Sequence, residues 1–236
     1  MTGAENARQK RRSSMSDNKA AYNSEIYDAR IASVLPYYRE YHAQVIDLVR
    51  AMNLESPRWL DTGCGTGTLA VRALEEIPGA RLTLSDPSEA MLDVARQKLS
   101  GRDVRFFGIP SQELPFDGEF DIVTAIQCHH YFRPKEREAA VRRCRRALRE
   151  GGIFVAFENI QMSSPESEAL VLLRWSKFLA DHGASPEEIQ MHLARRGTEV
   201  FPITIEEHLS LLRECGFRTA NLFWLSYLQA GFFAIK

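Results

Sequence analysis

The sequence predicts an α/β fold, in which a doubly wound, Rossmann-like sheet of seven mostly parallel strands ends in an antiparallel hairpin. Three observations predict it. From residue 58 onward, short apolar runs alternate with amphipathic helical stretches, which is typical of parallel β–α–β units. A glycine-rich turn follows the first of these runs, and an aspartate follows the second. Two further strand-like runs close the chain and are near enough in sequence to form a hairpin.

The composition indicates one α/β domain with an accessory element, since the chain has 236 residues. Its formal net charge of -1 does not favour general binding of nucleic acid. No apolar run is long enough to span a membrane, and the N-terminus lacks the apolar core of a signal peptide, so we expect a cytoplasmic protein. The four cysteines have no C-x-x-C spacing, which makes disulfides and structural zinc unexpected.

The region before the first strand is divided into two parts. Residues 1–21 are polar and contain a Lys-Arg-Arg cluster, and we expect them to form a disordered tail. Residues 22–52 predict two helices, because Pro36 would break a single one. We expect these helices to form a roof over the ligand site.

The sheet and its crossover helices follow in order. Strands are predicted at residues 58–61, 81–85, 104–107, 120–126 and 153–157, with helices at 68–76, 87–99 and 134–149. The fourth strand is almost entirely apolar, as expected for a strand covered by helices on both faces. Glu150-Gly-Gly152 contains residues suited to left-handed geometry, and we expect it to close the preceding helix.

An insertion interrupts this alternation at residues 159–202. It contains helical patterns at 165–181 and 186–196, after which a helix at 204–215 and strands at 217–224 and 229–236 complete the sheet. The insertion follows the carboxyl end of a strand, which is where ligands bind in open α/β sheets. We therefore expect a lid, with a purely stabilising insertion as the alternative.

The glycine-rich turn is the main functional signal. Gly63, Gly65 and Gly67 allow a sharp bend and let a ligand approach the main chain. A helix that begins near Thr68 points its N–H groups into the same space. Asp86, at the tip of the second strand, can accept two hydrogen bonds from a ribose diol. Together these features predict a site for a cofactor that contains adenosine.

The spacing of the glycines distinguishes between adenosine cofactors. It is G-x-G-x-G, whereas dinucleotide sites have G-x-G-x-x-G. Asp61 would repel a pyrophosphate but can hold the ammonium of an amino-acid group. The pattern D-x-G-C-G-T-G-x-L resembles motif I of the class I S-adenosylmethionine (SAM)-dependent methyltransferases. The resemblance implies SAM as the cofactor and contacts with it from Asp61, Gly63, Cys64, Gly65, Asp86, Pro87 and Met91.

The adenine contacts depart from the family pattern. The family usually has an acid near the adenine, where this chain has Ile109-Pro110-Ser111. We therefore expect Ser111, Gln112 or a backbone carbonyl to accept a hydrogen bond from the adenine amino group.

The segment Gln127-Cys-His-His-Tyr131 resembles the family's segment beside the methionine part of SAM. This resemblance places Gln127 at the cofactor. His129 and His130 are candidate general bases, because imidazole titrates near neutral pH. A structural role is the alternative for each histidine.

The predicted roof carries a closer resemblance. Tyr27-Asp-Ala-Arg-Ile-Ala-Ser-Val-Leu-Pro36 resembles the N-terminal segment of the bacterial carboxy-SAM synthases, and residues 158–236 resemble their C-terminal region. The resemblance implies that Tyr27 and Arg30 lie over the cofactor. Arg30 would pair with the SAM carboxylate or, alternatively, with a neighbouring helix. Tyr37, Tyr38, Tyr41 and Trp175 either line an acceptor pocket or pack in the core.

Carboxy-SAM synthases make carboxy-SAM from SAM and prephenate. They hold the added carboxylate with an arginine in the lid and an asparagine after the fourth strand. This chain has Leu193 and Ile126 at those positions, although Arg195 and Arg196 are close by in sequence. The departure favours a relative that uses ordinary SAM.

We therefore interpret the chain as a SAM-dependent methyltransferase for a small-molecule acceptor, which needs no metal. A carboxy-SAM synthase-like enzyme is the first alternative. The second is a non-catalytic SAM-binding subunit that presents arginines 142–149 to RNA. We expect no membrane partner, and a homodimer is compatible with the sequence.

Overall fold

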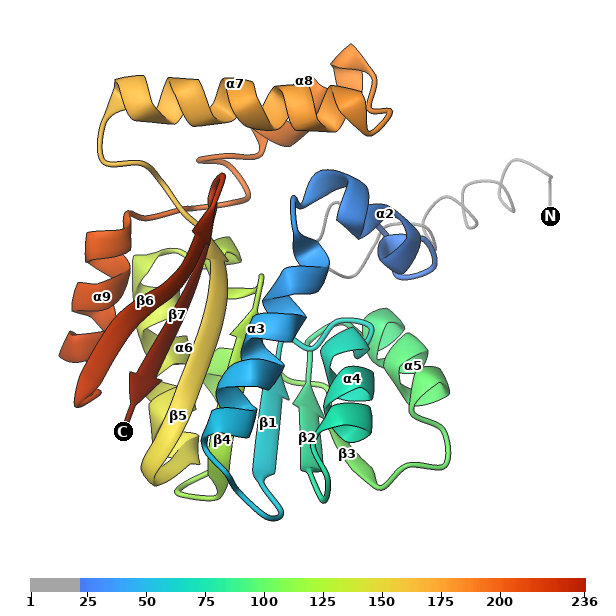
Figure 1. Cartoon of the computed structure of the whole chain (residues 1–236), viewed down its shortest axis with the longest axis vertical. Coiled ribbons are helices and arrows are strands. Elements are labelled where there is room, and N and C mark those ends of the chain that lie inside the picture. Colours follow the sequence, from blue (N-terminus) through green and yellow to red (C-terminus); the bar gives the residue numbers. More distant parts are fainter. Residues whose placement is uncertain (1–21) are drawn as a thin grey trace, which may run out of the picture.

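The computed structural model describes residues 22–236, so the tail predicted at residues 1–21 lies outside the described residues. One sheet of seven strands has the order β3-β2-β1-β4-β5-β7-β6 (Figure 1). Strands β1 to β5 are parallel to one another, and β7 runs antiparallel to both β5 and β6. The predicted fold class is confirmed, including the hairpin at the C-terminus.

The strands and helices lie close to the predicted positions. The strands are β1 (Arg58–Thr62), β2 (Arg81–Ser85), β3 (Val104–Phe107), β4 (Phe120–Ile126), β5 (Leu148–Asn159), β6 (Thr219–Ser226) and β7 (Gln229–Ile235). The longer helices are α2 (Tyr27–Val34), α3 (Tyr38–Ala51), α4 (Thr68–Glu76), α5 (Glu89–Lys98), α6 (Pro134–Ala147), α7 (Pro165–Asp181), α8 (Pro186–Ala194) and α9 (Ile205–Glu214). Two short 3₁₀ helices, η1 (Ser111–Glu113) and η2 (His129–Tyr131), follow β3 and β4.

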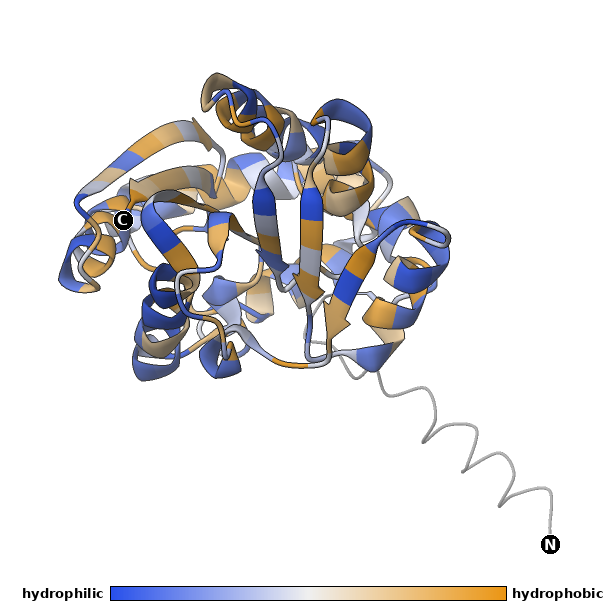
Figure 2. Cartoon of the chain, turned by 90° about the horizontal axis from the view of Figure 1, so that it is seen from below, coloured by the Kyte–Doolittle hydropathy of each residue, from blue (hydrophilic) through white to orange (hydrophobic). Residues whose placement is uncertain are grey.

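Two buried clusters hold the helical layers against the sheet. One lies under α3 and α4, and the other lies under α6 and α9. Figure 2 shows the sheet from below between these layers, with hydrophilic residues on the outer turns of the helices. Among residues 22–236, no helix is long and apolar enough to cross a membrane.

The start of β5 corrects the prediction at Glu150–Gly152. These residues do not close α6, which ends at Ala147; they belong to β5, which begins at Leu148. Gly151 has φ +75, and the register with β4 shifts nearby, so the glycines form an irregularity within the strand. Hydrogen bonds between Gly151 N–H and Lys236 C=O (3.2 Å) and between Lys236 N–H and Gly152 C=O (3.0 Å) secure it.

The predicted roof and lid both lie beyond the carboxyl ends of the strands (Figure 1). The roof contacts the lid through Trp175 of α7, whose Nε1–H donates to Val34 C=O of α2 at 2.8 Å. The lid is tied to the end of β5 by Arg196, which hydrogen-bonds the Asn159 side chain and Ile160 C=O and pairs with Glu168. The space between these segments and the strand ends contains the candidate site.

Candidate functional site

The glycine-rich loop connects β1 to α4, and its glycines serve different purposes. Gly65 has φ +52, and a Cβ placed there would meet no atom within 4 Å. Gly63 has φ +64, but a Cβ there would lie 2.5 Å from Cys128 Cβ. Gly65 therefore faces open space that a ligand can enter, whereas Gly63 allows the loop to pack closely against the segment after β4.

Asp86 holds the loop in place from the tip of β2. Its Oδ2 accepts the Gly65 N–H at 2.9 Å, and its Oδ1 accepts the Ser88 N–H at 2.9 Å. A carboxylate has about four lone-pair positions, so it can accept more hydrogen bonds than these two. The predicted ribose acid is thus also a structural contact of the loop.

Asp61 is buried at the end of β1, with 3% of its surface exposed. Burial raises the pKa of its carboxyl to about 7, and the charge of Asp86 adds to this rise, although a hydrogen bond from Thr124 opposes it. The Thr124 hydroxyl donates to Asp61 Oδ1 at 2.7 Å. A cation placed beside Asp61 would compensate the desolvation of this carboxylate.

The cavity above the loop, called here the cofactor cavity, is lined by Tyr27, Tyr38, His42, Asp61, Gly63, Cys64, Gly65, Thr66, Thr68, Leu69, Ile126 and Gln127. Asp28 of α2 binds two of these lining residues. Its carboxylate accepts hydrogen bonds from the Thr66 (2.6 Å) and Thr68 (3.1 Å) hydroxyls and pairs with Lys98 Nζ at 2.5 Å. The roof is therefore attached to the loop and to α5.

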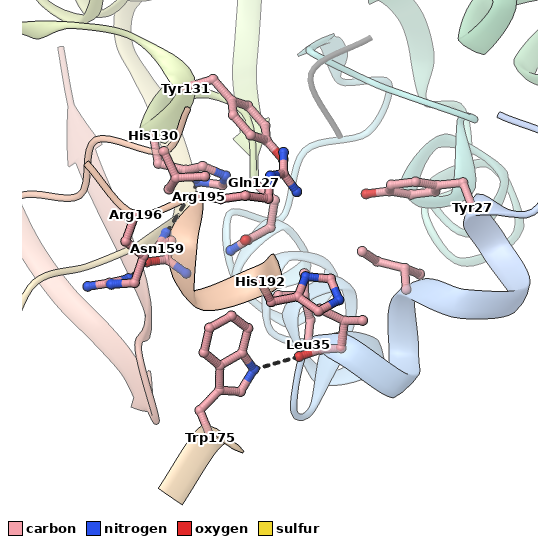
Figure 3. A pocket seen from close by; sticks show the side chains of 13 residues that line it. Tyr27, Leu35, Gln127, His130, Tyr131, Asn159, Trp175, His192, Arg195 and Arg196 are labelled. Atoms are coloured by element: carbon pink, nitrogen blue, oxygen red, sulfur yellow. Dashed lines mark hydrogen bonds between the residues drawn. The ribbon is translucent and has the colours of Figure 1, made fainter. Parts of the chain in front are cut away.

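A second cavity, called here the lid cavity, lies between the roof, the lid and the ends of β4 and β5 (Figure 3). One of its walls is apolar, with Ile31, Val34 and Leu35 from the roof side and Trp175 from α7. The remaining lining residues are Tyr27, Gln127, His130, Tyr131, Asn159, His192, Arg195, Arg196 and Val200. Tyr27 and Gln127 line both cavities, so the two spaces meet at these side chains.

Gln127 is held rigidly at this junction. It has φ +56, an uncommon backbone conformation for a residue other than glycine. Its N–H donates to Phe157 C=O at 2.7 Å, and its Nε2 donates to Oε1 of the buried Gln229 at 2.8 Å. Backbone strain of this kind is often found at functional sites.

The neighbouring histidines point in different directions, because they lie in a 3₁₀ turn with three residues per turn. His130 lines the lid cavity, and its Nδ1 lies 3.0 Å from Glu158 Oε2. His129 lies among Phe154, Arg137 and His208 and does not line either cavity described above. Its Nε2 contacts Ser111 Oγ at 3.0 Å, and burial lowers its pKa to about 4. This placement favours a structural role for His129. His130 remains the candidate general base.

Ser111 and Gln112, the expected adenine contacts, also differ in their surroundings. Ser111 is buried, and its hydroxyl contacts Thr62 Oγ1 (2.8 Å) and His129 Nε2 within the protein. Gln112 Oε1 is buried and has no hydrogen-bond partner in the protein. Pro87 is exposed and Met91 is buried, and neither lines either cavity.

Arg30 does not line either cavity and instead adopts the alternative given for it. Its Nη2 lies 3.4 Å from Glu188 Oε1 of α8, and its guanidinium lies over the Tyr22 ring. The Glu188 carboxylate, 158 residues away in sequence, could not be identified as its partner from local pattern.

Of the tyrosines and the tryptophan predicted to line an acceptor pocket or pack in the core, some line a cavity and others do not. Tyr38 lines the cofactor cavity and Trp175 the lid cavity, whereas Tyr41 is buried against Phe157 and Tyr37 is exposed. No sequence pattern pointed to His42, Asn159 or His192. Each is polar, lies in an otherwise ordinary segment and reaches a cavity only through tertiary packing.

Most of the arginines on which the carboxy-SAM and RNA-binding alternatives depend bind other residues of the protein. In the lid, Arg196 is bound to Asn159 and Glu168, and Arg195 Nε lies 2.7 Å from Glu199 Oε2. Four of the five arginines predicted to form a surface make ion pairs or hydrogen bonds with the protein, namely Arg142, Arg145 and Arg146 of α6 and Arg149 of β5. A paired, solvated helix face therefore accounts for this surface without RNA.

Comparisons with known proteins agree with this geometry. Residues 60–152 match the family described as a methyltransferase domain. The chain is similar to the carboxy-S-adenosyl-L-methionine synthase of Campylobacter lari, with 25% identity over 195 residues that cover 82% of this chain and 83% of the relative. The corresponding enzyme of Wolinella succinogenes is 29% identical over 211 residues, covering 86% and 87%.

A solved structure described as a SAM-dependent methyltransferase from Thermotoga maritima has a TM-score of 0.61 at 15% identity, over 90% of this chain and 95% of that one. Residues 60–152 thus match a methyltransferase domain, and the fold of the chain is similar to that of SAM-dependent methyltransferases. The chain resembles the carboxy-SAM synthase branch of that class. Enzymes of the SAM-dependent methyltransferase type use SAM as their cofactor, and the residues of the cofactor cavity fit it.

Proposed function

We propose that this methyltransferase transfers the methyl group of SAM to a small molecule bound in the lid cavity. The meeting of the two cavities at Tyr27 and Gln127 carries the proposal, because donor and acceptor must lie end to end in a displacement reaction. SAM supplies a methyl group on a positively charged sulfur, which is already activated as a leaving group. The protein therefore has to align the partners and exclude water.

Residues that line the cofactor cavity, together with Asp86 and Gln112, which do not line it, would match the parts of SAM. Asp61, with its raised pKa, would hold the ammonium of the methionine part, and Asp86 would accept from the ribose hydroxyls. Gly65 leaves the space that the nucleoside needs. The unpartnered Gln112 Oε1 would accept from the adenine amino group, because a buried carbonyl oxygen without a donor costs about 1–3 kcal/mol.

The lining of the lid cavity restricts the acceptor. The apolar wall of Ile31, Val34 and Trp175 suits a hydrocarbon or aromatic body. His130 faces the same space and can accept a proton from an O–H or N–H group. The acceptor that fits best is a compact molecule with an apolar body and one ionisable O–H or N–H group.

Carboxy-SAM synthesis is the second candidate, favoured by relatives that match more than four fifths of the chain. Arg195 is also a cation at the lid cavity, with its guanidinium 6.0 Å from the centre of the Tyr131 ring. Against this candidate, Arg195 is paired with Glu199, so an added carboxylate would have to compete with that ion pair. Ile126 also lines the cofactor cavity where an amide donor would be needed.

One experiment separates the candidates. The purified protein is incubated with SAM labelled in its methyl group, first with prephenate and then with a panel of phenols, hydroxylated rings and aromatic amines. Mass spectrometry then identifies the products. Methylated acceptor together with S-adenosylhomocysteine supports the proposal. Carboxy-SAM formed only when prephenate is present would replace it with the second candidate.

A further inference from the structure

Glu158 is a buried carboxylate that the proposed reaction does not itself require. It lies near the end of β5 with 1% of its surface exposed. Its Oε2 accepts the His130 N–H at 2.8 Å and contacts His130 Nδ1 at 3.0 Å, while Oε1 accepts the His129 N–H at 3.3 Å. Arg137 and His208 line the small space on its other side. A buried acid with these contacts either caps the η2 turn or acts on the ring of His130.

The charge of Glu158 is stabilised by these neighbours. Burial alone raises the pKa of this carboxyl, but the hydrogen bond and charge of His130, together with His129 and His208, outweigh it and leave the pKa below its usual value. Glu158 is therefore an anion at neutral pH, and an anionic carboxylate only accepts hydrogen bonds.

Two contacts compete for Nδ1 of His130. The Asn159 N–H approaches it at 3.3 Å, which would require a lone pair on Nδ1. Glu158 Oε2 approaches it at 3.0 Å, which requires a proton there. A hydrogen bond to an ionised acceptor is about twice as strong as a neutral one, and this contact is also the shorter. The proton therefore belongs on Nδ1, and the lone pair of the ring is on Nε2.

We infer that Glu158 is a positioning residue that fixes His130 in the Nδ1–H form, so that Nε2 accepts the proton of the methyl acceptor. The inference rests on the proposed function, in which His130 is the base. When the O–H or N–H group gives its proton to Nε2, its heteroatom keeps the electron pair that forms the new bond to the methyl carbon. Glu158 stays ionised throughout and stabilises the imidazolium that results.

The tautomer can be measured without an acceptor. In protein labelled with ¹⁵N-histidine, the ¹⁵N shifts of the neutral His130 ring, assigned with His130→Gln, should show Nδ1 protonated and Nε2 unprotonated. In Glu158→Gln the amide can donate to Nδ1, and the ring should change to the Nε2–H form. Glu119→Gln, an exposed acid paired with Arg58, should leave the signals unchanged. A wild-type ring in the Nε2–H form would overturn the inference, whether or not the variant folds.

A kinetic measurement separates positioning from capping. With the acceptor found in the product screen, Glu158→Gln should lower kcat about 100-fold, in the range typical of lost general-base catalysis, and leave the Kd for SAM within about twofold. Equal loss of kcat and of SAM affinity would indicate a merely structural role. If the screen finds no acceptor, the proposed function fails, while the NMR measurement still decides the role of Glu158.

Discussion

The raised pKa of Asp61 makes the binding of SAM depend on pH in a predictable way. With a pKa of about 7, the carboxyl is ionised in only about one tenth of the molecules at about pH 6. Because the apparent Kd is the intrinsic Kd divided by the competent fraction, SAM should bind about tenfold more weakly there than above the pKa. An α-amino group loses its proton above about 7.7–8.0, so affinity should be highest between these two values.

Isothermal titration calorimetry tests this expectation directly. Repeating the titration at about pH 6 in two buffers with different ionisation enthalpies should show release of about 0.9 proton per SAM bound, because the bound carboxyl is ionised. Asp61→Asn should bind weakly with no acid dependence, and Asp117→Asn, at an exposed acid paired with Arg146, should behave like the wild type. A wild-type Kd that is constant between about pH 6 and 7.5, without proton release, would refute the assignment of Asp61.

The same group also affects the stability of the ligand-free protein. The folded-state pKa of Asp61 lies above the value of about 3.9 expected for the unfolded chain. Its contribution to stability is therefore fully present below about pH 4 and is lost as the pH rises through about 7. SAM should restore part of this loss by supplying a cation next to the carboxylate.

Three further predictions concern the cofactor cavity. Gly63→Ala should lower the free energy of unfolding by about 2–5 kcal/mol, because a methyl group there would meet Cys128 and would also strain the backbone. Gly65→Ala should have only the backbone cost and should lose SAM affinity. Thermal melts and calorimetry measure the two effects, and an equal loss of stability in both variants would contradict this reasoning. Gln112→Met should weaken SAM binding about 2- to 10-fold without lowering the melting temperature, because it removes an unpartnered oxygen, and unchanged affinity would exclude the adenine contact. Asp28→Asn should weaken the attachment of α2 to Thr66, Thr68 and Lys98, so SAM should dissociate several-fold faster in stopped-flow measurements. An unchanged dissociation rate would mean that this attachment does not retain the cofactor.

The elements of the fold were predictable because their signals are local. Apolar periodicity, Pro36 and the glycine-rich loop placed most helices and strands within one or two residues of the structure. The start of β5 was not predictable, because Gly151 and Gly152 resemble a helix end in sequence, and their partner Lys236 lies at the other end of the chain. Local residue chemistry indicates where the chain bends but does not reveal which distant strand it pairs with.

Some residues of the site could likewise be predicted from local sequence and others could not. The loop and Asp86 could be read from spacing, since their geometry is set within one β–α–β unit. The two histidines could not be distinguished, because neighbours in a 3₁₀ turn point in different directions, and only the fold brings the ring of His130 to Glu158 and the ring of His129 to Ser111. Ser111 and Gln112 were equivalent in sequence, and only the fold shows that Ser111 is hydrogen-bonded to Thr62 whereas Gln112 Oε1 has no partner among the described residues.

The way the lid is attached affects how the reactants and products reach and leave the two cavities. Arg196 fixes one end of the lid to β5, and Arg137 of α6 binds Phe201 C=O beyond it, so this side is strongly anchored. On the opposite side α2 meets α7 and α8 through Trp175 and the exposed pair of Arg30 with Glu188. Since Tyr27 on α2 borders both compartments, outward movement of that helix would open them together. We therefore expect SAM, the acceptor and both products to enter and leave through the same opening.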